Sequence, residues 1–166
     1  MPRTFGSVDE FAAQVGTDLG CADGPVITQA MIDEFGALTG SDDWIHSDPI
    51  RARASQFGGT IAQADLVLSM IPRLMDRIYR VEGVGVGLIY GSNRVRFTSP
   101  IPVDSKLRLQ ASMLDATPKA GGTQVTLKVI VRAESVEKPV MVAEVVYWYS
   151  PESSEEERET PKGGTP

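Results

Sequence analysis

The chain has 166 residues but only one cysteine, Cys21, and one histidine, His46. A single cysteine excludes an internal disulfide and is typical of a reducing compartment, so we expect a cytoplasmic protein. One histidine with one cysteine leaves no recognisable zinc site, although a metal site built from carboxylates alone stays open. The sequence therefore predicts neither a bound metal nor another cofactor.

Long apolar runs and an excess of basic residues are also missing. No stretch approaches the roughly 20 apolar residues that a membrane-spanning helix needs. The N-terminus carries Asp9 and Glu10 and has no continuous apolar segment, so it does not match a signal peptide. Lysine and arginine total 16 against 22 acidic residues and do not cluster with aromatic side chains. We expect neither a membrane nor a nucleic acid as a partner.

The acidic charge is concentrated in the C-terminal tail. Residues 150–166 contain five glutamates against Arg158 and Lys162, which gives −3 of the total formal charge of −6. This tail is rich in Pro, Gly, Ser and Glu and has no apolar residues, so it cannot offset the entropy of ordering. We predict one folded domain over residues 1–150 and a disordered acidic tail over residues 151–166.

Helical patterns occupy the first half of the domain. Residues 7–16 begin with a serine cap and a capping-box glutamate and end at a glycine. Residues 28–40 run from a threonine cap to a glycine, and residues 48–55 begin with Asp48 followed by a proline. Residues 61–81 are the most apolar segment and predict a buried helix that bends at Pro72.

The pattern then changes from a period of 3.6 to a period of two. Strands are predicted over 84–91, 93–100, 105–116, 123–135 and 140–150, with a hairpin turn at residues 117–123. Apolar and polar residues alternate along most of them, as expected for half-buried antiparallel strands. A buried helix followed by such strands predicts an α+β fold in which the sheet wraps around that helix.

Two segments carry a family resemblance. They are FGALTGSDDWIHSDPIRARASQFGGTIAQADLVLSMIP (residues 35–72) and YGSNRVRFTSPIPVDSKLR (residues 90–108). They resemble the MaoC-like, (R)-specific enoyl-CoA hydratase family, and within it the nodulation-protein-N-like branch. With weaker similarity near both ends, the resemblance covers most of residues 3–150. It implies a single hot-dog fold, a homodimer, and a small acyl thioester substrate carried on coenzyme A or on a carrier protein.

The resemblance also implies hydratase or dehydratase chemistry and a set of site residues. The family places an aspartate five positions before a histidine, and the two move the protons of one water molecule. His46 matches the histidine, but Ser41 stands at the aspartate position. Asp42 and Asp65 are then the candidates for the second catalytic carboxylate. Substrate-binding residues are expected to be Ser41, Gln63, Ala64 and Gly59.

The start of the buried helix departs from the family pattern as well. Ala62-Gln63-Ala64 replaces the usual Ala-His-Gly, and Asp65 follows where an apolar residue is usual. The Ala64 N–H still supplies a donor for the thioester oxygen. Two alternatives stay open: a hot-dog thioesterase that uses Asp65, and a non-catalytic hot-dog subunit or binding protein that keeps only the pocket.

Overall fold

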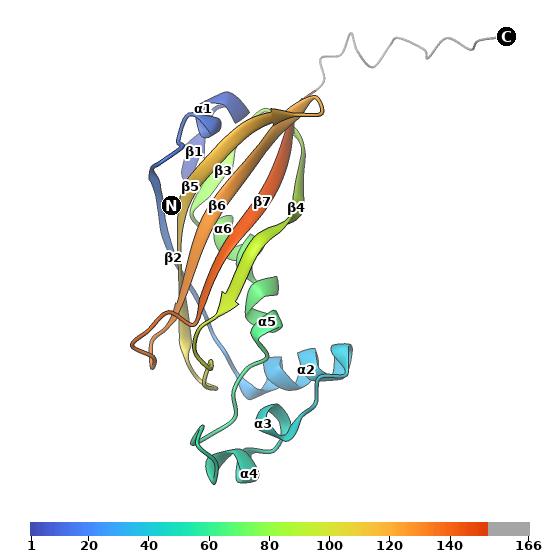
Figure 1. Cartoon of the computed structure of the whole chain (residues 1–166), viewed down its shortest axis with the longest axis vertical. Helices are drawn as coiled ribbons and strands as arrows, with labels where there is room; N and C mark the ends of the chain where they lie inside the picture. The colour runs from blue at the N-terminus through green and yellow to red at the C-terminus, as the bar shows by residue number, and fades with distance from the viewer. Residues whose placement is uncertain (153–166) are drawn as a thin grey trace, which may run out of the picture.

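The computed structural model describes residues 1–152, so the predicted disordered tail lies outside the described residues from residue 153 onward. A five-stranded antiparallel sheet curves around two short consecutive helices, α5 (Ala64–Ser69) and α6 (Ile71–Met75) (Figure 1). The strand order is β2-β5-β6-β7-β4. The strands are β2 (Asp18–Val26), β4 (Val84–Phe97), β5 (Lys106–Lys119), β6 (Gly122–Ala133) and β7 (Met141–Pro151).

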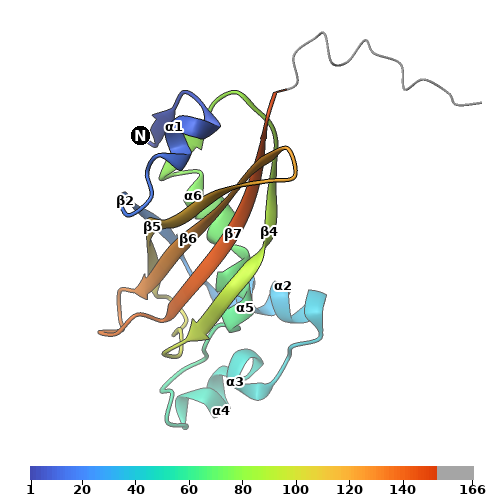
Figure 2. The ribbon, with the colours of Figure 1, turned by 45° about the horizontal axis from the view of Figure 1, so that its top comes forward.

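The remaining elements lie at the two ends of this sheet. At one end, β1 (Arg3–Phe5) pairs in parallel with β3 (Tyr79–Val81), next to α1 (Val8–Ala12). Beyond the other end lie α2 (Gln29–Thr39), α3 (Trp44–Ser47) and α4 (Pro49–Arg53) (Figures 1 and 2). The His46 loop therefore lies at the end of the sheet where α5 begins.

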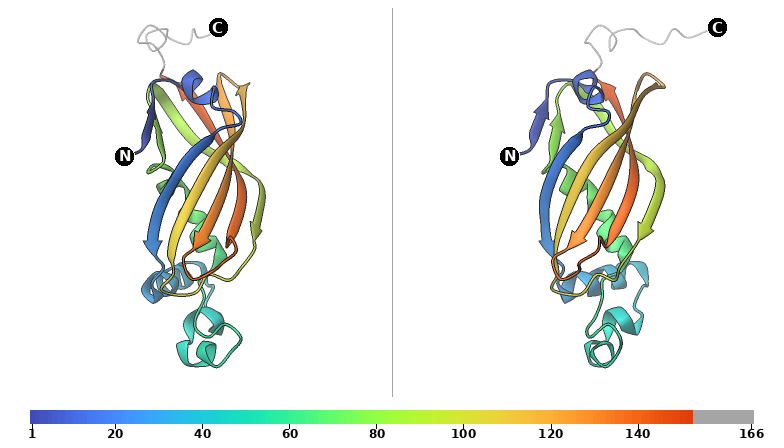
Figure 3. Two further views of the ribbon diagram at one scale, coloured as in Figure 1. Left: turned by 90° about the vertical axis from the view of Figure 1, so that its left-hand side faces the viewer. Right: turned by 60° about the vertical axis from the view of Figure 1, so that its left-hand side comes forward.

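Alternating burial along the strands builds the core and confirms the α+β prediction. In β5, Leu107 and Leu109 are fully buried, while Lys106 and Arg108, which alternate with them, are exposed. Burying such a leucine stabilises the fold by roughly 1.5–3 kcal/mol. The buried apolar side chains of the sheet pack with those of α5 and α6 in one core. The sheet curves around these two helices (Figure 3).

The central helix differs from the prediction. It breaks at Met70 into α5 and α6, two residues before Pro72, and α6 ends at Met75. Pro72 has no N–H to donate to the Leu68 carbonyl, so a continuous helix would lose a backbone hydrogen bond there. Residues 79–81 form strand β3 rather than helix, because their backbone pairs with β1.

Two strand predictions also need correction. Residues 84–91 and 93–100 were predicted as separate strands, but residues 84–97 form the single strand β4, which has register irregularities at its start and on both sides of Gly91. The sequence patterns missed β2, which has a glycine-containing, irregular register with β5. The predicted hairpin is confirmed: Ala120 and Gly121 have φ of 49° and 76°, the positive values that a two-residue hairpin turn needs.

The predicted helix caps are largely confirmed. The hydroxyl oxygens of Ser7 and Thr28 accept backbone N–H groups at the starts of α1 and α2. Asp48 caps α4, whose first residue is a proline, and α1 ends at Ala12, before the predicted Gly16. Within residues 1–152, no helix has the length and apolar character to cross a membrane.

Candidate active site

His46 lies on the short helix α3, which follows a sharp turn at the end of α2. Gly40 ends α2 in the left-handed conformation, with φ of 73°, and its N–H donates to the Gly36 carbonyl. The Ser47 hydroxyl then donates to the Asp42 carbonyl across 2.7 Å, which holds α3 against the preceding loop. His46 itself is half-buried. The local backbone thus presents the imidazole next to the segment that leads into α5.

The imidazole has a defined tautomer. Its Nδ1 lies 2.7 Å from the carbonyl oxygen of Ile61. A carbonyl can only accept, so Nδ1 carries a proton, and in the neutral ring the lone pair is then on Nε2. Neutral His46 is therefore set up to take a proton at Nε2, while its other nitrogen fixes the plane of the ring.

A second set of contacts fixes the backbone of His46. The Gln29 amide donates to the His46 carbonyl across 2.7 Å, and the Thr60 hydroxyl donates to Gln29 Oε1 across 2.5 Å. The Ile61 N–H donates to the Ile45 carbonyl across 3.0 Å. Thr60 is buried, while Gln29 and His46 are half-buried, so the network runs from the interior to the partly exposed loop. The sequence reasoning missed Gln29 and Thr60, because nothing in their local patterns relates positions 31 residues apart.

Gln63 connects α2, the loop and the start of α5. Its side chain is 5% exposed, and its Nε2 donates to the carbonyl oxygens of Ile32 and Ser41. The other amide atom, Oε1, is buried and has no donor among the described residues. Gln63 therefore holds the Ser41 backbone through Nε2. Its Oε1 is a buried acceptor without a donor, which costs about 1–3 kcal/mol.

Gly36 is needed for this packing of the loop against α2. A Cβ added at Gly36 would lie 2.9 Å from the Ser41 carbonyl oxygen and 3.3 Å from Gln63 Nε2. No side chain fits that space, so the helix and the loop make direct backbone contact. Ser41, the residue at the family's aspartate position, is half-buried there.

The candidate carboxylates, Asp42 and Asp65, form no ion pair with the His46 imidazole. Within residues 1–152, no carboxylate oxygen lies within 4.0 Å of a His46 ring nitrogen. Asp42 is exposed in the loop, and Asp65 is exposed in the first turn of α5. Asp48 instead caps α4, where it accepts the N–H groups of Ile50 and Arg51. The assignment of Asp42 or Asp65 as the second carboxylate stays a prediction.

The remaining predicted site residues lie close together in the chain around the start of α5. Ala64 is the first residue of α5, so its N–H has no acceptor within the helix. Gly59 is half-buried, and a Cβ added there would meet nothing within 4 Å. Trp44, beside His46, is half-buried, and the Arg51 guanidinium lies 4.3 Å from its ring centre. The aromatic ring therefore packs α3 against α4.

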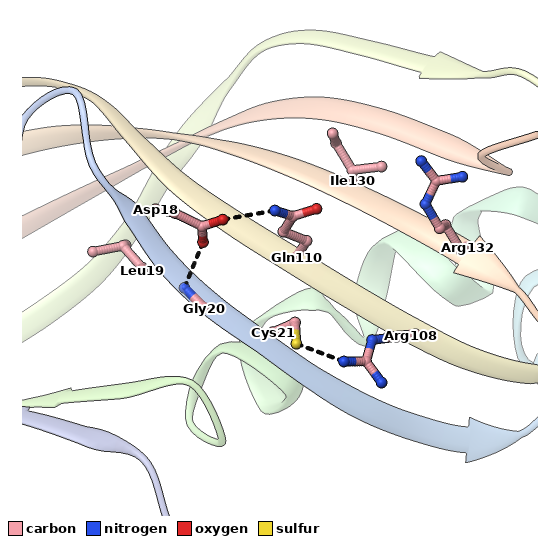
Figure 4. Close-up of a pocket in the computed structure, with 8 residues that line it drawn as sticks. All are labelled: Asp18, Leu19, Gly20, Cys21, Arg108, Gln110, Ile130 and Arg132. Atoms are coloured by element: carbon pink, nitrogen blue, oxygen red, sulfur yellow. Dashed lines mark hydrogen bonds between the residues drawn. The ribbon is translucent and has the colours of Figure 1, made fainter.

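A separate hollow of about 370 Å³ lies on the outer face of the sheet, away from the His46 loop (Figure 4). Arg108 donates to Cys21 Sγ across 2.8 Å, and Gln110 donates to Asp18 across 2.7 Å. These polar groups satisfy one another, and none of the predicted site residues lines the hollow. It therefore has no part in the chemistry considered for His46.

Comparison with known proteins identifies the family. The family described as "MaoC like domain" matches residues 10–135. The chain belongs to the MaoC-like domain family. A similar relative is 3-hydroxyacyl-thioester dehydratase Z of Mycobacterium tuberculosis, with 41% identity over 148 residues, 89% of this chain and 98% of the relative. Nodulation protein N of Rhizobium leguminosarum bv. viciae is 31% identical over 140 residues, 82% of this chain and 87% of the relative.

Solved structures confirm the hot-dog fold of this MaoC-like chain. The monoamine oxidase regulatory protein from Archaeoglobus fulgius superposes with a TM-score of 0.72 at 24% identity, over 92% of this chain and 99% of that one. The unliganded R-hydratase PhaJ1 from Pseudomonas aeruginosa gives a TM-score of 0.67 at 23% identity, over 83% of each chain. The fold predicted from the sequence resemblance is therefore correct.

Proposed function

We propose that this MaoC-like protein is a hydratase or dehydratase that interconverts a 3-hydroxyacyl thioester and its enoyl thioester. The observation that carries the proposal is the fixed tautomer of His46, which leaves Nε2 able to exchange a proton beside the start of α5. The similarity to a 3-hydroxyacyl-thioester dehydratase supports the same chemistry. No cofactor is required for it.

In the hydration direction, His46 Nε2 accepts a proton from water as the water oxygen bonds to C3 of the enoyl chain. The C2–C3 π electrons move toward the thioester, whose oxygen becomes negative and accepts the Ala64 N–H. C2 then receives this proton back from the His46 imidazolium, directly or through the second carboxyl group, and the thioester carbonyl reforms. Asp65 or Asp42 assists the proton transfers, while Ser41, Gln63 and Gly59 contact the bound acyl group. Dehydration follows the same steps in reverse.

A homodimer is part of the proposal. β4 is an edge strand, and five of its large apolar side chains are between 45% and 60% exposed: Val86, Leu88, Ile89, Tyr90 and Phe97. An exposed apolar edge strand favours pairing with another strand, and a two-fold axis lets the same edge of a second copy supply it. The acyl carrier, coenzyme A or a carrier protein, is the other expected partner.

A second candidate is a passive binder of acyl thioesters. It is favoured by the absence of a carboxylate within 4.0 Å of the His46 ring nitrogens among residues 1–152. A thioesterase that uses Asp65 is a third outcome that the same assay detects. A hydratase adds water across the C2–C3 double bond, a thioesterase breaks the thioester bond, and a passive binder breaks neither.

The test is incubation with crotonyl-coenzyme A while two signals are followed. Loss of the conjugated thioester absorbance alone indicates hydration, and release of free thiol indicates thioester hydrolysis. Binding without either signal favours the passive binder. We expect hydration, and we expect His46→Gln to lower kcat by about 100-fold or more, the usual contribution of a general acid or base.

Two further variants sharpen this test. Ser41→Asp restores the family's carboxylate and should raise the hydration rate, whereas Ser112→Asp, in the middle of β5, should leave it unchanged. Full activity in His46→Gln would refute the proposed mechanism.

A further inference from the structure

A second hollow, separate from the His46 loop, lies beside the free edge of β2. Its volume is about 290 Å³, near the lower end for small-molecule sites. The strand β2 forms the sheet edge opposite to β4, so pairing through β4 leaves this region uncovered. The lining comes from β2, from α2 and from the α5–α6 segment with the turn after it. It includes Gly24, Met31, Met70, Arg73, Leu74 and Arg77.

The floor of the hollow is apolar and adaptable. Leu74 is buried, and Met31 and Met70 are half-buried and pack against the core. Methionine side chains are flexible and polarizable, so they fit alkyl chains of varied shape. Gly24 lets the backbone of β2 pack directly against the core. A Cβ added there would lie 3.4 Å from the Leu74 side chain and 2.9 Å from Leu107 Cβ. This floor suits a hydrocarbon chain.

The rim of the hollow carries two positive charges. Arg73 lies in α6 and Arg77 lies in the turn that follows it, and both are exposed and line the hollow. Arg77 donates one N–H to the Asp23 carbonyl across 2.9 Å, which fixes its guanidinium over the hollow. In the described part of the chain, no carboxylate lies within 4.0 Å of either guanidinium. An anion placed at the rim would satisfy both.

We propose that this hollow binds an unesterified straight-chain acyl carboxylate, with the carboxylate at Arg73 and Arg77 and the alkyl chain over Met31, Met70 and Leu74. A guanidinium pairs with a carboxylate through charge-assisted hydrogen bonds. A phosphate would suit the rim equally well, but the apolar floor selects a ligand with a hydrocarbon chain. The volume corresponds to a ligand of roughly ten heavy atoms, such as octanoate.

The site is distinct from the proposed catalytic pocket. None of the residues assigned to the thioester reaction lines this hollow. Two elements are shared: α2 presents Met31 to the hollow while its Ile32 carbonyl accepts the Gln63 amide, and the α5–α6 segment runs from Ala64 to the hollow. A free acyl acid is the product of thioester hydrolysis, so the ligand belongs to the same chemical class as the proposed substrate.

The test is calorimetric titration of the purified full chain with sodium octanoate, 1-octanol and ADP. We expect octanoate to bind at one site per chain with a dissociation constant of about 1 mM or tighter. Octanol, which lacks the charge, and ADP, which lacks the chain, should each bind at least about tenfold more weakly. Equal binding of octanol would overturn the role of the arginines, and preferential binding of ADP would replace the carboxylate with a phosphate ligand.

Variants locate the site. Arg73→Gln and Arg77→Gln should each weaken octanoate binding by about tenfold, because each removes a charge-assisted contact. Arg132→Gln, an equally exposed arginine on the outer face of β6, is the matched control and should change nothing. Methyl NMR signals of Met31 and Met70 should shift on titration. Unchanged methyl signals, or unaltered affinity in both rim variants, would place octanoate elsewhere and refute the proposal.

Discussion

At the scale of single residues, two of the departures from the family pattern are physically connected. Ser41 replaces the family's aspartate and Gln63 replaces its histidine, and the Gln63 amide donates to the Ser41 carbonyl across 3.0 Å. The loop position is therefore determined in part by the side chain at the start of α5. Restoring an aspartate at position 41 changes the acid–base groups without removing this contact, because the contact uses only the Ser41 backbone.

Thr60 is the residue whose loss should disturb the His46 loop most selectively. Thr60→Val keeps the shape of a buried side chain but removes the donor to Oε1 of the half-buried Gln29. We expect the free energy of unfolding to fall by about 1 kcal/mol, the usual net contribution of one hydrogen bond, measured by urea denaturation. The hydration rate should fall as well, because Gln29 holds the His46 carbonyl.

The control for this prediction is Thr39→Val. Thr39 is exposed and its hydroxyl donates to a carbonyl one turn earlier in α2, so little stability should be lost. If both variants lost the same stability, the buried network would not be what holds the loop.

At the scale of elements, the patterns predicted regular segments well and interruptions poorly. The caps of α2 and α4 were predictable because serine, threonine, aspartate, proline and glycine have strong local preferences at helix ends. The break at Met70 was not placed correctly, because Pro72 excludes a hydrogen bond without specifying where the backbone adjusts. β2 was missed because an irregular edge strand that contains glycines shows little alternation.

An aromatic cluster joins α1 and β3 to β7 and should make stability depend on alkaline pH. Burial raises the pKa of Tyr149 to about 12, and burial holds the pKa of Tyr79 well above its usual range. The two hydroxyl groups are 2.9 Å apart. Unfolded tyrosine titrates near pH 10, so the folded state keeps these protons longer than the unfolded state does. The resulting stabilisation is fully present below about pH 10 and is lost as the pH rises toward about 12.

Urea denaturation at a series of pH values from 9 to 11.5 measures this effect. We expect the free energy of unfolding to fall with pH, and the slope to be shallower in Tyr149→Phe. Tyr90→Phe, at an exposed position of β4, should keep the wild-type slope. A slope that Tyr149→Phe leaves unchanged would exclude the cluster as the cause.

At the scale of the whole molecule, the sheet has two edges of different character. The β2 edge carries Asp18 and Asp23, whereas the β4 edge exposes large apolar side chains. We expect a dimer through β4, and we expect Ile89→Lys to shift it to monomers, because a charge buried in an apolar interface costs several kcal/mol. Sedimentation equilibrium measures the mass. Val15→Lys, also at an exposed apolar position, should leave the dimer intact.

The candidate site was predictable only in part. The position of His46 and the fold around it follow from the sequence resemblance. The hydrogen bond from Nδ1 to Ile61, and the link through Gln29 and Thr60, depend on how α2, α3 and the segment before α5 pack together. Such contacts between distant positions leave no periodic signal in one chain. The exposure of Asp65 was equally hidden, because an acid in a first helical turn has the same local pattern whether it faces a cavity or solvent.

The presence of a single imidazole also makes the His46 loop unusually easy to observe. Every histidine NMR resonance comes from this one ring. A reagent that modifies imidazoles can likewise react only here. Because Ile61 occupies Nδ1, only Nε2 has a lone pair with which to attack an electrophile. Labelling should therefore stop at one equivalent per chain and yield one regioisomer, and a bound ligand that covers Nε2 should slow the labelling.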